Sequence, residues 1–153
     1  MKWIAVGLGT IVVSYALSWF TLRRIRARSQ ALAAGLQEKY GADLLRLSGG
    51  GIITSYNRVP GVLALTRDAF LYSAAITKDE GSIPLATVDK IVMQATRNSD
   101  YPRARKYRKA VVMALHLQDG DCKLFVISQE DYAHWRIALA RKGIQLETDR
   151  PRG

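Results

Sequence analysis

The chain has 153 residues, enough for one ordinary domain, and a formal net charge of +10. Its single cysteine, Cys122, excludes a disulfide framework and a cysteine-based metal site within the chain. Residues 22–28 carry four arginines and no acid, and residues 97–109 carry six basic residues and one acid. The remainder, with 13 basic and 12 acidic residues, is nearly neutral. The excess charge therefore lies in two segments suited to acidic partners.

Residues 3–22, WIAVGLGTIVVSYALSWFTL, form a run of 20 residues without a charge. A helix of this length spans about 30 Å, the thickness of the hydrocarbon core of a bilayer. Trp3 and Trp19 lie near its two ends, where aromatic side chains meet the membrane interface. We predict an uncleaved transmembrane anchor at residues 1–22. A cleaved signal peptide fits less well, because the run is long and no small-x-small cleavage site precedes the arginines.

The residues that flank this run predict the orientation of the anchor. Only Lys2 precedes it, whereas four arginines that we place at the membrane interface follow it: Arg23, Arg24, Arg26 and Arg28. The positive-inside rule then predicts a single pass through the cell (inner) membrane, with the N-terminus outside and the C-terminal body in the cytoplasm. Pairs of small residues at i,i+4, Ala5/Gly9 and Ser14/Ser18, permit close helix packing. An ordinary lipid-facing helix explains these pairs equally well.

Residues 23–48 are predicted to form a juxtamembrane connector helix. An apolar stripe supports it, formed by Ile25, Leu32, Leu36, Tyr40 and Leu44. The three glycines at 49–51 are predicted to end the helix and act as a hinge. The sequence leaves open whether this helix continues the membrane helix or lies on the membrane surface.

From residue 52 the pattern changes to about six or seven short antiparallel strands. The predicted strands are 52–57, 61–66, 69–75, 88–95, 110–117 and 122–128, with residues 83–85 leading into the fourth. Arg58–Pro60 is expected to connect the first two, and 78–82 to be a polar turn.

A C-terminal helix is predicted after the last strand. Ser128 and Asp131 resemble a capping box at its start, and Gly143 is placed to end it. Its buried face is expected to contain Tyr132, Trp135 and Leu139, at helical spacing. The tail at 144–153 is predicted to be flexible.

Several of these runs resemble the pleckstrin-homology (PH) superfold, especially its GRAM-like and bacterial branches. They are GVLALTRDAFLY, IPLATVDKIVM and VVMALHLQDGDCKLFVIS, followed by a helix with Trp135. The resemblance covers roughly residues 50–143, and it implies a PH/GRAM-like domain at residues 49–143. It implies an α+β fold, a PH-like antiparallel sheet or barrel capped by a C-terminal helix, and a binding or scaffolding role. Phosphoinositide-binding members carry a basic cluster in the loop that joins the first two strands. The matching loop here has only Arg58, so that mode of recognition is not expected.

The second charged segment contains the stretch YPRARKYRK and is the main candidate binding site. Its basic residues are Arg97, Arg103, Arg105, Lys106, Arg108 and Lys109. We expect them to contact an acidic surface on another subunit of a membrane complex. The alternatives are the headgroups of anionic membrane lipids and a solvated loop that supports solubility. Tyr101 and Tyr107 interleave the charges as in nucleic-acid contacts, but a membrane anchor argues against that partner.

Residues with catalytic or metal-binding chemistry are few. A Cys122–histidine–acid nucleophilic site is conceivable, but a strand cysteine is usually a small core residue. Asp119 and Asp121 flank a glycine, which a hairpin turn explains without a calcium ion. We therefore predict a protein that is not an enzyme and has no cofactor, metal or small-molecule substrate. The expected role is an accessory or assembly subunit of a larger membrane protein complex, and the alternative is a sensor of anionic lipid at the inner leaflet.

Overall fold

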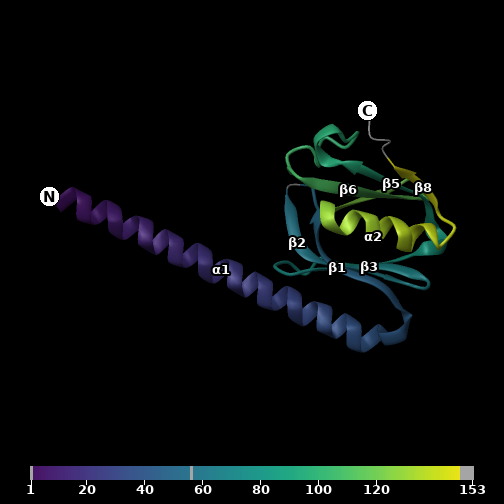
Figure 1. Cartoon of the computed structure of the whole chain (residues 1–153), viewed down its shortest axis with the longest axis horizontal. Helices are drawn as coiled ribbons and strands as arrows, with labels where there is room; N and C mark the ends of the chain where they lie inside the picture. Colours follow the sequence, from purple (N-terminus) through teal and green to yellow (C-terminus); the bar gives the residue numbers. More distant parts are fainter. Residues whose placement is uncertain (1, 56, 149–153) are drawn as a thin grey trace.

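The computed structural model describes residues 2–55 and 57–148, and it describes side chains from Ser14 onward. The described chain is α+β, with an N-terminal helix, a sheet of eight mostly antiparallel strands and a C-terminal helix (Figure 1). Its elements are α1 (Lys2–Tyr40), η1 (Gly41–Asp43), β1 (Leu44–Ile53), β2 (Arg58–Thr66), β3 (Ala69–Ala74), β4 (Glu80–Pro84), η2 (Leu85–Thr87), β5 (Val88–Ala95), η3 (Thr96–Asn98), β6 (Ala110–Leu117), β7 (Cys122–Ser128), α2 (Gln129–Ala140) and β8 (Gln145–Thr148).

The strands follow the order β4-β3-β2-β1-β7-β6-β5-β8. Strand β1 joins the two halves of the sheet, because it pairs with β2 along its length and with β7 at Gly51–Ile53. The sheet bends at this strand, and α2 lies between the two halves (Figure 1). Among the described strands, β8 pairs in parallel with β5 and the other pairs are antiparallel. This arrangement places one core between the inner faces of the sheet and α2.

Trp135 lies at the centre of that core. Its side chain is fully buried, and its ring centroid is 5.7 Å from that of Phe70, which in turn is 4.8 Å from Phe125. The indole Nε1–H donates to the Ser48 hydroxyl at 2.9 Å, so the polar edge of the ring is satisfied. Leu139 is fully buried beside it. The prediction that this face of the last helix packs on the sheet is confirmed.

The start and end of α2 also match the sequence pattern. The Ser128 hydroxyl accepts from the Asp131 backbone N–H at 3.1 Å and donates to the Asp131 carboxylate at 3.0 Å. These contacts satisfy a backbone donor that the first turn of a helix leaves free. After the last turn, Gly143 has a φ of +68°, as expected of a helix-ending glycine.

The predicted connector helix at 23–48 is wrong at its C-terminal end. The helix stops at Tyr40, Gly41 has a φ of +43°, and residues 44–53 form strand β1, which includes the three glycines at 49–51. The glycines are therefore part of the sheet and do not form a hinge. A Cβ at Gly50 would lie 2.6 Å from the Leu63 side chain and 3.0 Å from the Val126 carbonyl. Glycine lets β1 pass closely between β2 and β7.

Three further predictions differ from the structure. Arg58–Pro60 begins β2 and is not a connection, and residues 80–84, expected as a turn and a lead-in, form the edge strand β4. In the tail, Gln145–Thr148 forms β8, which brings Leu146 against the core and places Glu147 3.1 Å from Lys90. A segment whose composition is polar is therefore a strand, paired with β5 and packed against the core through Leu146. Residues 149–153 lie outside the described residues.

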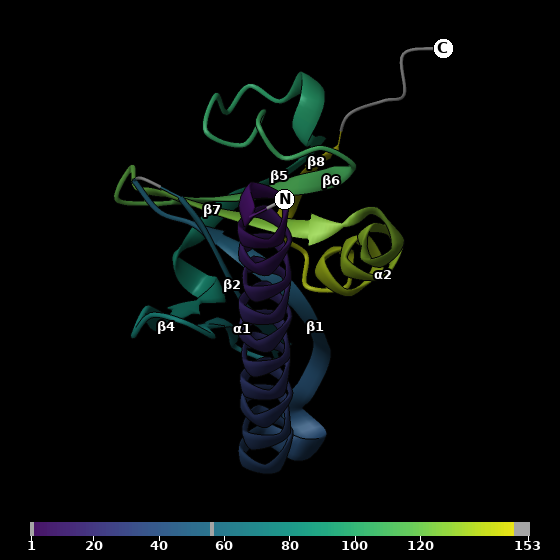
Figure 2. The ribbon, with the colours of Figure 1, turned by 90° about the vertical axis from the view of Figure 1, so that its left-hand side faces the viewer.

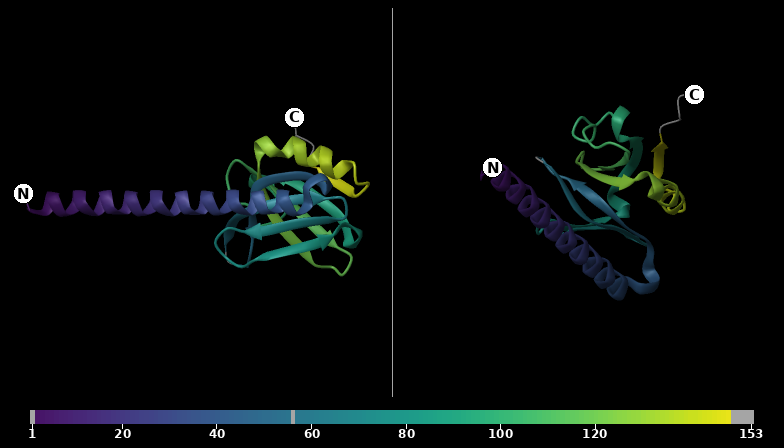
Figure 3. Two further views of the ribbon diagram at one scale, coloured as in Figure 1. Left: turned by 90° about the horizontal axis from the view of Figure 1, so that it is seen from below. Right: turned by 60° about the vertical axis from the view of Figure 1, so that its left-hand side comes forward.

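Helix α1 runs without a break from Lys2 to Tyr40, so the connector continues the N-terminal helix. Its C-terminal part lies against β1 and β2, and its N-terminal part projects from the domain (Figures 1 and 3). Within the described part of the chain, no helix carries an apolar run long enough to cross a membrane. Residues 1–13 of the predicted anchor lie outside the described side chains. The anchor at 1–22 therefore stays a prediction.

Candidate functional site

The basic loop, residues 96–109, connects β5 to β6 and starts with η3. It stands beyond these two strands at the top of the molecule, clear of α1 (Figure 2). The loop folds over one face of β6, because Tyr101 contacts His116 there and the same face carries the fully buried Val112 and Ala114.

Buried residues give the basic loop a small interior of its own. Thr96, Ser99 and Ala104 are almost completely buried. The Thr96 hydroxyl contacts the Tyr107 carbonyl and lies 3.0 Å from the Ala110 carbonyl, which ties the two ends of the loop together. Within the loop, the Tyr107 N–H donates to the Ala104 carbonyl at 3.0 Å. The charged side chains are thus carried by a folded segment.

Three titratable side chains meet at the base of this loop. The Tyr101 hydroxyl lies 2.7 Å from His116 Nε2, and Cys122 Sγ lies 3.9 Å from the same nitrogen. Burial, followed by the negative charges of Cys122, Asp100 and Glu147, raises the pKa of Tyr101 to about 12. The contact between the Tyr101 hydroxyl and His116 anchors the loop to β6.

The structure brings Cys122 and His116 together, as the conceivable nucleophilic site requires. Burial, and then the charge of Asp121, raises the pKa of the Cys122 thiol. A reactive cysteine needs the opposite shift, a lowered pKa that favours the thiolate form. The local electrostatics therefore favour an unreactive thiol and offer no support for this site.

Four of the six predicted basic residues share one cavity of about 650 Å³. We call Arg97, Arg105, Arg108 and Lys109 the cationic cradle. The other lining residues are polar or small, namely Ala95, Thr96, Asn98, Ala110 and Gln129. The salt bridges among residues 2–55 and 57–148 join other pairs, so none of the four cradle cations has a carboxylate partner there. The cradle therefore presents concentrated positive charge to an anionic ligand.

The other two predicted residues lie outside the cradle. Arg103 lines a second cavity of about 360 Å³, which also contains Asp79 and Asp121. Lys106 lies over the Tyr107 ring, with Nζ 5.3 Å from the centroid. Sequence alone treats all six cations as one cluster, whereas the fold divides them into four and two.

The predicted residues of the N-terminal helix are separate from the basic loop. Side chains of Ser14, Ser18 and Trp19 are exposed, as are the four interface arginines. Arg23 lies over the Trp19 ring, 5.2 Å from its centroid. Trp3, Ala5 and Gly9 lie outside the described side chains. The contacts of these residues with membrane lipid or with a packed helix stay predictions.

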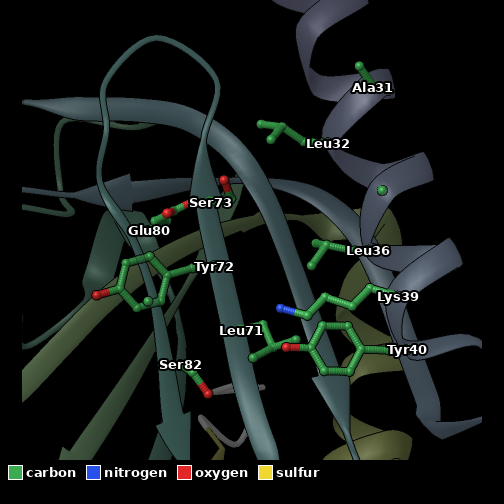
Figure 4. Close-up of a pocket in the computed structure, with 12 residues that line it drawn as sticks. Ala31, Leu32, Leu36, Lys39, Tyr40, Leu71, Tyr72, Ser73, Glu80 and Ser82 are labelled. Carbon is green, nitrogen blue, oxygen red and sulfur yellow. The ribbon is translucent and has the colours of Figure 1, made fainter.

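A third concave surface lies between α1 and the strands β3 and β4. Figure 4 shows Leu32 and Leu36 of α1 on one side and Leu71 of β3 on the other. The groove has a volume of about 530 Å³, and Lys39 and Glu80 are the charged residues in its lining. With one cation and one acid, it lacks the charge excess of the cradle.

Comparisons with known proteins bear on the fold alone. No family model and no curated protein matches the chain. A crystal structure of the C-terminal domain of an unknown protein from Leishmania infantum is similar over 74% of this chain and 94% of its own, at 13% identity and a TM-score of 0.53.

Two further solved structures have lower scores. The Spt16D Pob3N heterodimer matches at 10% identity and a TM-score of 0.48, over 71% of this chain and 58% of its own. The hSac2 domain from human phosphoinositide phosphatase Sac2 matches at 14% identity and a TM-score of 0.47, over 79% of this chain and 85% of its own.

Proposed function

We propose that this chain is a membrane-anchored, PH-like binding module that serves as an accessory or assembly subunit of a larger membrane protein complex. The observation that carries the proposal is the cationic cradle, whose four cations lack carboxylate partners among the described residues. Supporting the PH-like assignment, a bent antiparallel sheet encloses a core that a C-terminal helix closes with Trp135.

In this proposal residues 1–22 cross the inner membrane, with the N-terminus outside and the domain in the cytoplasm. Large apolar side chains support this part: Leu17, Phe20 and Leu22 on the projecting half of α1 are all more than 60% exposed. An exposed apolar surface of this kind is unfavourable in water. A lipid bilayer or a partner protein would bury it. Arg23, Arg24, Arg26 and Arg28 would then lie among the inner headgroups.

The partner of the basic loop is an acidic surface on another subunit. Guanidinium groups form paired hydrogen bonds with carboxylates, and three of the four cradle cations are arginines. The anchor already supplies attachment to the membrane, so the loop is available for a neighbouring protein. Contacts made by α1 and by the loop give two separate surfaces for assembly.

Anionic lipid headgroups are the second candidate partner. In Figure 1 the loop above β6 lies on the side of the domain from which the N-terminal half of α1 projects. A membrane around that half would bring headgroups toward the loop, at a gain of about 1 kcal/mol per cation near the surface. This reading makes the domain a sensor of anionic lipid at the inner leaflet.

A native extraction tests the subunit proposal. The full chain is extracted from its own membranes in mild detergent and run on native gels, beside a cradle variant with Arg97, Arg108 and Lys109 changed to Gln. A matched control changes three exposed cations elsewhere, Lys78, Arg136 and Arg141, to Gln. We expect the wild type and the control to migrate with a co-purifying protein and the cradle variant to lose it. Migration of all three as a free 17.0 kDa species would overturn the proposal.

Flotation with liposomes tests the lipid candidate. The same three proteins are mixed with vesicles that contain phosphatidylserine and with neutral vesicles. If lipid is the partner, the cradle variant loses its preference for phosphatidylserine and the control keeps it. Equal preference in all three proteins would remove this candidate.

A further inference from the structure

We infer that the cationic cradle binds an extended acidic peptide segment of the partner subunit, through a fixed cavity and not through diffuse surface charge. This inference rests on the proposed function and names the ligand chemistry of the same site. It assigns the contacts to Arg97, Arg105, Arg108 and Lys109 and leaves Arg103 and Lys106 outside the binding site.

The size of the cavity favours a chain segment over a single anion. At about 650 Å³ it falls within the range of about 300–1,000 Å³ that is typical of ligand pockets. One carboxylate or phosphate group would leave most of this space empty. Asn98 and Gln129 in the lining carry amide groups that donate to and accept from a peptide backbone. Arginine forks and side-chain amides together suit a peptide with several carboxylates.

Contacts within the domain hold Arg105 and the two ends of the basic loop in place. Arg105 Nε donates to the Ser99 carbonyl at 2.7 Å, which fixes the guanidinium while leaving its two terminal nitrogens for a ligand. The contacts of the Thr96 hydroxyl tie the two ends of the loop together, and Thr96 itself lines the cavity. Rigid positioning of this kind lowers the entropy cost of binding.

Lys109 provides an independent indication that the cavity has a function. Its φ is +54°, and it is the one residue other than glycine with a positive φ among those the structure describes. Glycine would adopt this conformation with less strain. A strained lysine whose side chain lines the cavity is the pattern found at binding sites that keep a charge at a cost in stability.

The tyrosines of the loop argue against a nucleic-acid ligand. Single-stranded nucleic acid binds through bases that stack on free aromatic rings. Tyr101 is held against His116, and the Tyr107 ring has Arg58 and Lys106 within 5.7 and 5.3 Å of its centroid. Both rings are therefore engaged within the domain.

A labelled hexaglutamate peptide tests the inference against the full chain in nonionic detergent, by fluorescence anisotropy. Two double variants remove the same net charge: Arg108→Gln with Lys109→Gln inside the cradle, and Arg103→Gln with Lys106→Gln outside it. Arg105 is left intact because it supports the loop. Because hydrogen bonds between charged groups are stronger than those between neutral groups, the cradle variant should lose about tenfold or more in affinity. The outer variant should stay within about twofold, because neither of its two side chains lines the cavity.

Each outcome decides the inference. Equal losses in the two variants mean that binding follows net charge, which overturns it. The inference is also overturned if the cradle variant no longer binds phosphatidylserine vesicles but keeps its affinity for the peptide. If the peptide fails to bind but the native complex still needs the cradle charges, the inference fails and the proposed function stands. If the complex is indifferent to those charges, the proposed function fails whatever the peptide does. Circular dichroism and thermal unfolding of both variants confirm that each is folded.

Discussion

The guanidinium carbon of Arg58 lies 5.7 Å from the centroid of the Tyr107 ring, so the first residue of β2 contacts the basic loop. The stem of Arg58 runs over Gly51, where a Cβ would lie 2.3 Å from Arg58 Nε. The absence of a side chain at Gly51 makes room for this contact. Arg58, at the start of β2, therefore belongs to the surface around the basic loop.

The close approach of β2 and β3 at Gly61 can be tested by a single methyl group. In Gly61→Ala the new Cβ would lie 2.4 Å from the Ser73 carbonyl oxygen, which is backbone and cannot rotate away. Overpacking of this kind costs about 1–3 kcal/mol of the free energy of unfolding. Gly49→Ala is the matched control, because no atom lies within 4 Å of its Cβ, and it should change that free energy by less than about 0.5 kcal/mol. Denaturant unfolding measures both, and equal midpoints would contradict the predicted clash.

Short apolar segments bounded by turn residues are predictable as strands from the sequence. The strands 88–95, 110–117 and 122–128 have the bounds that the sequence predicts, and Ser128 caps the start of α2 as predicted. The segment 44–51 is misassigned because Leu44 continues the helical spacing of α1, while three glycines are typical of a break. Its strand conformation depends on pairing with β2 and β7, which are distant in sequence.

The candidate site was predictable in charge but not in shape. Clustered Lys and Arg residues reveal an electrostatic site directly. Their division depends on the folded loop, where Arg105 turns back to Ser99 and Lys106 lies over Tyr107. The contribution of Arg58 was missed because no local pattern links it to a loop about 50 residues away. The contact with Tyr107 exists only in the tertiary structure.

The hydrogen bond between Trp135 and Ser48 should be needed for full stability. Ser48→Ala removes the acceptor and leaves the buried indole N–H without a partner, which costs about 1–3 kcal/mol. Ser82→Ala, at an exposed position of β4, should change the free energy of unfolding by less than about 0.5 kcal/mol. Thermal unfolding followed by circular dichroism compares them. A Ser48 variant as stable as the wild type would show that the indole finds another acceptor.

Tyr101 should make the domain less stable in alkaline solution. The unfolded chain ionises this tyrosine near its ordinary pKa of 10.0, whereas burial holds the pKa at about 12 in the folded chain. The folded state therefore binds more protons between these values, and the free energy of unfolding falls as the pH rises from about 10 to about 12. Below pH 10 the group is neutral in both states and has no effect.

An absorbance titration of tyrosinate checks this shift directly. The chain has seven tyrosines, and the step from Tyr101 should occur near pH 12 if the domain stays folded. Tyr101→Phe should delete that step and flatten the alkaline loss of stability. A late step that survives in Tyr101→Phe would assign it to another tyrosine and contradict the burial of this hydroxyl.

Lys109 should show a conflict between stability and binding. Its φ of +54° costs an ordinary residue about 1–2 kcal/mol, so Lys109→Gly should keep or raise the free energy of unfolding while it removes one cation of the cradle. We expect weaker binding of the hexaglutamate peptide. Lys106→Gly is the control, because Lys106 has no positive φ and lies outside the cavity. It should lose about 0.4–1 kcal/mol through added freedom of the unfolded chain and keep its peptide affinity. Denaturant unfolding and anisotropy measure the two effects. A Lys109→Gly variant that is less stable than the wild type would contradict the strain at Lys109, and one that keeps its peptide affinity would contradict its role in the cradle.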